Sequence, residues 1–255
     1  MSFISTRVGQ FTYFDLCLGT PDWRTKKVLD FGGNIGNLLT TGSTIDPRNY
    51  WCIDVSRDAI AQGRAAYPEA HFVFYDRYNW AFNPTGTEGL PIPDPGVWFD
   101  VIVAYSVFTH TNQSETRELV EQLRALLAPG GTIAFTFIDP GYCQSQQPGD
   151  GYFDGTNLEW RLAKAKRLNP HIDVDAMKAK ARDASWITLV NDERLYVDDE
   201  DADSSEFTRQ SGYHTFCTPL HVATLFPDAV VVLPPRDAYP PPIAYEMQHC
   251  CLLRA

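Results

Sequence analysis

The chain has 255 residues, which is enough for one sizeable core, and its 44% hydrophobic and 21% charged residues are ordinary for a globular protein. Its formal net charge of -11 repels phosphate backbones and anionic lipid surfaces, so neither nucleic acid nor a membrane is expected as a partner. The 6 cysteines form no CxxC pair and lack the spacing of a disulfide framework, which favours a reducing compartment.

The N-terminal segment, residues 1–25, has no basic start followed by an apolar run, as a secretory signal would need. No later stretch approaches the length of a membrane span. We therefore expect a cytoplasmic protein with a single domain over residues 1–255.

Short apolar runs then alternate with polar segments of helical periodicity, a pattern that predicts a parallel sheet with helices on it. The predicted strands are residues 26–31, 49–54, 71–75, 99–105 and 132–138. Before the last of these, residues 113–127 place leucines on one helical face. The Pro-Gly-Gly at 129–131 is expected to end that helix and turn the chain.

From residue 141 to 216 the alternation breaks, which predicts an insertion on the substrate side of the sheet, between strands 5 and 6. It contains a basic helical stretch, 161–182, a hairpin around 187–197 and an acidic run, 198–206. Such runs are usually solvated, so we predict no metal site there. The sequence leaves open whether the insertion is a lid or the arm of a homodimer.

After the insertion, Thr218-Pro219 predicts a helix start, with a hydroxyl cap and a proline in the first turn. The last two predicted strands, 229–233 and 246–254, are joined by a Pro-rich connection too short for a crossover helix, so they should be antiparallel. The expected fold is therefore α/β, a Rossmann-like, doubly wound, seven-stranded sheet that is mostly parallel and has an antiparallel last strand.

A glycine-rich turn follows the first strand, with Gly32, Gly33 and Gly36 between that strand and an expected helix. Small residues let the backbone approach a ligand closely, and a helix start offers unpaired N–H groups, although such glycines often only make a tight connection. Asp54 ends the next strand, where an acid can accept hydrogen bonds from both hydroxyls of a ribose. Its alternative role, a helix cap, is already filled by Ser56.

Together these pieces resemble the class I S-adenosylmethionine-dependent methyltransferases over residues 26–140, and in outline over the last two strands. The residues that carry the resemblance are Asp30, Gly32, Gly36, Asp54 after the second strand and Asp76 after the third. FDVIVAYSVFTHT at the fourth strand and LLAPGGTIAF before the fifth complete the series in the family's order.

The resemblance implies S-adenosyl-L-methionine as the cofactor, with the methionine part at Asp30 and the turn, the ribose at Asp54 and the adenine amino group at Asp76. The backbone at Ala104 and Tyr105 would support the methionine end. The whole implied cofactor site is Asp30, Gly32, Gly33, Asn34, Gly36, Asp54, Val55, Asp76, Arg77, Ala104, Tyr105 and Ser106.

One departure from the family is Asn34, which stands where its central glycine is usual. Asn tolerates left-handed backbone better than most residues, so the turn is expected to survive. The same residue argues against a dinucleotide-binding GxGxxG motif, which would need glycine at both Asn34 and Asn37.

Residues just after the fourth strand lie beside the sulfonium in this family, which makes His110 the first candidate for a general base. His214, near the end of the insertion, is the second, and either histidine can instead be purely structural. Candidate substrate-binding residues, each taken singly more often a core residue, are Tyr13, Phe14, Asp139, Trp160, Trp186, Tyr213 and Phe216.

The function that these expectations favour is methyl transfer to O, N or C of a small or medium-sized organic metabolite, in specialised metabolism. A peptide or protein side chain is the alternative acceptor. An NAD-dependent oxidoreductase and a non-catalytic cofactor-binding protein are the other classes that share the fold.

Overall fold

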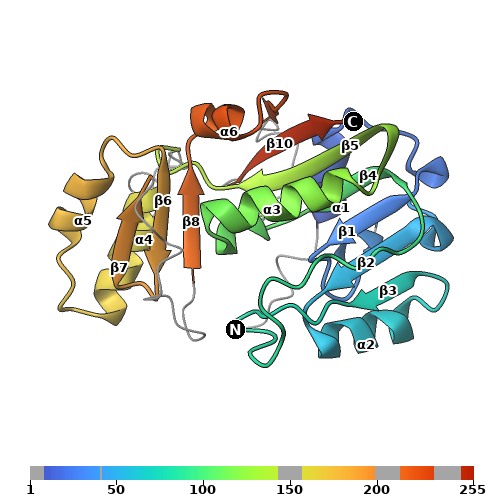
Figure 1. The fold of residues 1–255 in the computed structure, drawn as a ribbon, viewed down its shortest axis with the longest axis horizontal. Helices are drawn as coiled ribbons and strands as arrows, with labels where there is room; N and C mark the ends of the chain where they lie inside the picture. The colour runs from blue at the N-terminus through green and yellow to red at the C-terminus, as the bar shows by residue number, and fades with distance from the viewer. Residues whose placement is uncertain (1–8, 41, 143–156, 199–212, 233–247) are drawn as a thin grey trace.

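The computed structural model describes residues 9–40, 42–142, 157–198, 213–232 and 248–255, and its largest element is a seven-stranded sheet of order β3-β2-β1-β4-β5-β10-β9 (Figure 1). The strands are β1 Val28–Phe31, β2 Tyr50–Asp54, β3 His71–Phe74, β4 Phe99–Ala104, β5 Leu127–Phe137, β9 Val230–Val232 and β10 His249–Arg254. Neighbours pair in parallel except at β10, which is antiparallel to both β5 and β9. The expected doubly wound sheet with a reversed last strand is confirmed.

Helices cover both faces of this sheet. The helices α1 Gln10–Cys17 and α2 Arg57–Ala66 bury Phe14 and Ile60 in the core of one face. The helices α3 Gln113–Arg124 and α6 Pro219–Leu225 pack on the other face. The N-terminal segment thus contributes a packed layer to the core.

Two helix starts form as their sequences predict. The Ser56 hydroxyl accepts a hydrogen bond from the Ala59 N–H at the start of α2. The Thr218 hydroxyl accepts one from the His221 N–H at the start of α6, with Pro219 in the first turn. Each cap satisfies a backbone donor that the helix itself leaves unpaired.

The prediction of a helix after the glycine turn is wrong. The chain there makes only a single 3₁₀ turn, η3 Asn37–Leu39, before the 3₁₀ turn η4 Pro47–Asn49 leads into β2. No helix start therefore points N–H groups at the turn. Leu38 of η3 and Phe11 and Phe14 of α1 belong to the same core cluster, so α1 packs against this turn.

The prediction that Pro-Gly-Gly at 129–131 ends the helix is also wrong. The helix α3 ends at Arg124, and the Pro-Gly-Gly lies inside β5, which begins at Leu127 opposite Phe99. Gly130 has a φ of 75°, and the register against β4 shifts between Phe99 and Val101. A left-handed glycine absorbs this irregularity, as in a β-bulge, so the strand continues through the segment.

The insertion carries a second, three-stranded sheet of order β7-β6-β8, made of β6 Trp186–Val190, β7 Arg194–Val197 and β8 Tyr213–Cys217. The predicted hairpin is confirmed as β6 and β7, whereas β8 was not predicted. The basic stretch forms two helices, α4 Asn157–Leu168 and α5 Val174–Ala181, separated at Pro170. The insertion has a core of its own, which includes Leu158, Leu162, Ile187, Leu189, Leu195 and Phe216.

This second sheet stands beside the carboxyl ends of β4 and β5 (Figure 1). The Cys217 N–H donates to the Ile138 carbonyl (2.9 Å), and the Thr215 hydroxyl donates to the Thr111 carbonyl (2.6 Å). Ile138 directly follows β5, and Thr111 lies in the segment between β4 and α3. The insertion is therefore fixed to the edge at which the parallel strands end.

Some expectations fall partly outside the described residues. Of the acidic run, Asp198 is described and accepts the Ser185 and Trp186 N–H groups, while residues 199–206 lie outside. The described cysteines, all buried and unpaired, are Cys17, Cys52, Cys217, Cys250 and Cys251. Within the described ranges, none of the helices has the length and apolar character needed to cross a bilayer.

Candidate functional site

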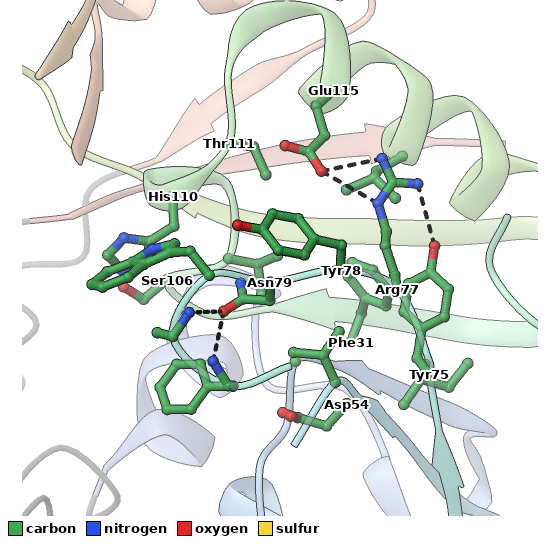
Figure 2. A pocket seen from close by; sticks show the side chains of 18 of the residues that line it. Phe31, Asp54, Tyr75, Arg77, Tyr78, Asn79, Ser106, His110, Thr111 and Glu115 are labelled. Carbon is green, nitrogen blue, oxygen red and sulfur yellow. Dashed lines mark hydrogen bonds and ion pairs between the residues drawn. The ribbon is translucent and has the colours of Figure 1, made fainter. Parts of the chain in front are cut away.

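A cavity of about 570 Å³ opens at the carboxyl ends of β1, β2 and β4 (Figure 2). These ends flank the point between β1 and β4 at which the strand order reverses, where ligands of doubly wound sheets usually bind. The predicted cofactor residues that line it are Gly32, Asn34, Asp54, Val55, Arg77, Tyr105 and Ser106. Those that do not line it are Asp30, Gly33, Gly36, Asp76 and Ala104.

In the turn after β1, Gly32 and Asn34 have a left-handed backbone conformation that residues other than glycine rarely adopt. Gly32 has a φ of 75°, and a Cβ there would lie 2.4 Å from Val107 Cγ2. Asn34 has a φ of 56°, which agrees with the expectation that asparagine tolerates this position. Its N–H donates to Asp54 Oδ2 (2.8 Å), so the turn is fixed to the end of β2.

Asp54 reaches the wall of the cavity but is only 8% exposed. Its Oδ1 accepts the Ser56 N–H (2.7 Å) and its Oδ2 accepts the Asn34 N–H (2.8 Å). Burial raises the pKa of Asp54, while the backbone N–H groups oppose that rise. Each carboxylate oxygen has a second lone pair, so both can still accept a hydrogen bond from a ligand hydroxyl.

Asp30 lies beneath the turn and is 1% exposed. The Tyr50 hydroxyl donates to its Oδ2 (2.6 Å), and a Cβ at Gly33 would come within 2.4 Å of its Cγ. Burial raises the pKa of Asp30 to about 7, helped by the charge of Asp54. The missing side chain at Gly33 thus makes room for Asp30, which supports the turn from below without lining the cavity.

After β3, only one of two adjacent predicted cofactor residues lines the cavity. Asp76 is exposed and accepts a hydrogen bond from the Asn83 side chain (3.0 Å), whereas Arg77 is buried and lines the cavity. The Arg77 guanidinium pairs with Glu115 (3.1 Å) and Glu118 (3.0 Å) of α3. The segment after the third strand therefore presents to the cavity an arginine that is paired with two carboxylates, while Asp76, expected at the adenine amino group, does not line it.

The loop after Arg77 was not predicted as part of the site. Figure 2 shows the Tyr78 ring lying across the cavity between His110 and Arg77. Asn79 Oδ1 accepts the N–H groups of Ala81 and Phe82 (3.0 Å each), which closes a tight turn. Phe82 is 60% exposed, and aromatic residues in this polar segment were the signal that sequence reasoning passed over.

The end of β4 is strained where it borders the cavity. Ser106 has a φ of 55°, unusual for a residue other than glycine. Its N–H donates to the Thr136 hydroxyl of β5 (2.7 Å), and its own hydroxyl lies 3.0 Å from that of Thr109. Such strain persists only when surrounding contacts fix it, and it tends to occur at functional sites.

Both histidine candidates lie at this point. His110 belongs to the 3₁₀ turn η5 Phe108–His110, and His214 to β8, and their ring centroids are 5.1 Å apart. Both rings and Ser106 also line a second cavity of about 180 Å³. Burial lowers the pKa of His214 to about 2, and the charge of Arg161 acts in the same direction, so this imidazole is neutral at physiological pH.

The predicted substrate residues divide into three groups. Trp160 and Phe216 line the second cavity. Tyr13, Phe14 and Trp186 are buried in the core, and Asp139 accepts the Gly141 N–H (2.9 Å) and lines neither cavity. The side chain of Tyr213 lies outside the described residues.

The core position of Tyr13 and Phe14 gives them an indirect connection to the cavity. Their rings meet Tyr105 edge to face, with centroids 5.9 Å and 6.2 Å from it. They therefore position a cavity residue and do not wall a substrate pocket.

Part of the chain matches a known protein family. A sequence family described as "Methyltransferase domain" matches residues 29–133. That range runs from the first strand through the glycine turn, Asp54 and the end of β4 into β5.

Solved structures resemble the whole chain at low identity. The glycopeptide N-methyltransferase MtfA complexed with S-adenosyl-L-methionine is 12% identical, with a TM-score of 0.53 over 98% of this chain and 95% of that one. The CcbJ methyltransferase from Streptomyces caelestis is 13% identical, with a TM-score of 0.50 over 97% and 89%. An S-adenosylmethionine-dependent methyltransferase from Mesorhizobium loti is 14% identical, with a TM-score of 0.50 over 98% and 100%.

At these identities the structural likeness establishes a shared fold, and the family match adds a methyltransferase-domain assignment for residues 29–133. The fold is the seven-stranded arrangement with a reversed last strand, and the family match covers the part of the chain that forms the larger cavity. Together they show a methyltransferase-domain match over residues 29–133, within a chain that has the fold of S-adenosylmethionine-dependent methyltransferases.

Proposed function

We propose that this enzyme transfers a methyl group to O, N or C of a small or medium-sized organic molecule, with the cofactor in the larger cavity and the acceptor in the smaller one. The observation that carries the proposal is that Ser106, His110 and His214 line both cavities. The two spaces therefore meet at the end of β4, where a donor and an acceptor could face each other.

The larger cavity suits a sulfonium nucleoside. Its volume of about 570 Å³ lies within the range of small-molecule sites. Asp54 has unused acceptor capacity for the two ribose hydroxyls. Gly32 and Asn34 present backbone to the same space, and Tyr105 and Ser106 border the side nearest the second cavity.

When bound, the cofactor supplies an electrophilic methyl group on a positively charged sulfur. The chain's part is mainly to orient the acceptor, because alignment of the reacting groups provides much of the acceleration. Of the two histidines, His110 is the candidate to take a proton from an acceptor that must lose one. His214, with a pKa of about 2, is too weak a base for that role and instead offers a neutral ring that can hydrogen-bond the acceptor.

The proposal is tested with methyl-labelled S-adenosyl-L-methionine, incubated with small-molecule and peptide fractions side by side. We expect labelled product from the small-molecule fraction. Label only in the peptide fraction would show that the acceptor class is wrong. Isothermal titration with S-adenosyl-L-methionine and with NAD provides the control, since only the first should bind.

A further inference from the structure

The smaller cavity has a composition that the transfer of a methyl group does not by itself require. It lies between the end of β5, the helix α4 and the strand β8 of the insertion. One part of its wall is apolar, with Ile138, Trp160 and Phe216, and another part carries the polar residues Ser106, Thr109, His110 and His214. Arg161 adds a single guanidinium. Apolar walls with a few placed polar groups and one charged group suit a ligand that has an apolar body and one charged end.

Arg161 is 9% exposed. One edge of its guanidinium donates to Asp192, in the turn between β6 and β7 (2.7 Å). Its buried Nε has no hydrogen-bond partner among the described residues. A buried donor without a partner costs free energy, and a ligand that accepts from this Nε–H would remove that cost.

The charges around the cavity are also unbalanced. Lys164, one helical turn after Arg161, lies 5.8 Å from the Trp160 ring centroid, and both cations act on His214. Among the described residues, Asp192 is the carboxylate that pairs with Arg161. Arg161 lines the cavity and its partner Asp192 does not, so the described wall presents positive charge, which repels a cationic ligand and favours an anionic one.

We propose that the methyl acceptor carries a carboxylate, which Arg161 binds while the apolar body of the acceptor lies between Trp160 and Phe216. This inference rests on the proposed function, because it takes the smaller cavity as the acceptor site. A guanidinium that already shares one edge with Asp192 still has donors for a carboxylate. The rest of the acceptor would then point toward His110 and Ser106, where the two cavities meet.

The test uses pairs of compounds that differ in charge but hardly in shape. Benzoate and benzamide, phenylacetate and phenylacetamide, and indole-3-acetate and its amide are titrated calorimetrically into the enzyme saturated with S-adenosylhomocysteine. We expect at least one acid to bind about tenfold more tightly than its amide, a typical ratio for a charge-assisted hydrogen bond. Arg161→Gln should bring that ratio to about one, and Arg161→Lys should retain part of it.

Asp192→Asn provides a variant in which the arginine remains. It removes the competing carboxylate, so the preference for the acid should increase. This readout also covers the case in which Arg161→Gln fails to fold. S-adenosylhomocysteine should bind all of these variants within about threefold of the unchanged enzyme, because Arg161 does not line the larger cavity.

The outcomes are distinct. If no acid binds better than its amide while S-adenosylhomocysteine still binds, or if Arg161→Gln keeps the preference, the carboxylate inference is wrong and the methyltransferase proposal stands. If S-adenosylhomocysteine itself fails to bind the unchanged enzyme, the proposed function fails before the acceptor is considered.

Discussion

Replacing Asp30 with asparagine should make the protein more stable above neutral pH. Burial raises the pKa of this carboxyl from an ordinary value of 3.8 to about 7. At pH values between these two, the unfolded chain has already released the proton and the folded protein still holds it. Folding therefore binds a proton, and the stability due to this group is complete below the lower value and is lost as pH rises through the higher one.

The size of the effect follows from the same two values. Each pH unit between them corresponds to about 1.4 kcal/mol, so ionised Asp30 costs the folded state about 4 kcal/mol at pH 8, as an upper limit for a buried group. In Asp30→Asn the amide oxygen can still accept the Tyr50 hydroxyl, which now lies 2.6 Å from Oδ2. The substitution thus removes the charge and keeps the hydrogen bond.

The assay is urea unfolding of both proteins at a series of pH values from 5 to 8. Asp30→Asn should gain stability relative to the unchanged protein as pH rises, and the gain should level off above about pH 7. Tyr50→Phe is the matched control, because it removes the hydrogen bond and leaves the carboxyl. The free energy of unfolding of this variant should still decrease as pH rises. Parallel stability curves for Asp30→Asn and the unchanged protein would refute the reasoning.

Three further substitutions test the site. Asp54→Asn should weaken binding of S-adenosylhomocysteine by about ten- to a hundredfold in a calorimetric titration, since charged acceptors of ribose hydroxyls contribute about 1.5–3 kcal/mol; unchanged affinity would contradict the ribose assignment. His110→Ala should lower turnover about a hundredfold at near-normal cofactor affinity, and equal turnover would leave His110 a structural residue. Arg77→Met should lower the free energy of unfolding by about 2 kcal/mol, because Glu115 and Glu118 lose their shared partner, and an unaltered urea midpoint would mean that the pair is too exposed to contribute.

Much of the main sheet could be predicted because buried parallel strands are nearly continuous apolar runs. The strands β1, β2 and β4 have almost every residue buried, so their sequences stand out from the polar segments around them. The strand β8 was missed because its sequence, YHTFC, is not a continuous apolar run and its partner β6 is not adjacent in the chain. The two strands of a hairpin are adjacent in the sequence and can be recognised together, whereas β6 and β8 are not adjacent.

The site was predicted less completely because side-chain direction depends on single positions. At the end of β3, a difference of one residue decides whether Asp76 or Arg77 faces the cavity, since successive side chains point to opposite faces. The same limit applies on α4, where the basic composition was evident but the burial of Arg161 depends on its pairing with Asp192 in a distant turn. Composition indicated the basic segment, whereas the tertiary contact with Asp192 determines that Arg161 is the buried residue.

The insertion is a structural part of the site and not a separate appendage. The hydroxyl of Thr215 donates to the Thr111 carbonyl, directly after η5, and this bond sets the neighbouring His214 against His110. On the other side, Thr136 of β5 fixes the strained backbone of Ser106. The end of β4 is thus held by the main sheet and by the insertion at once, so a change in how β8 packs would alter the place where the two cavities meet. Under the proposed function, a different insertion after the fifth strand would change the acceptor while the common sheet stays the same.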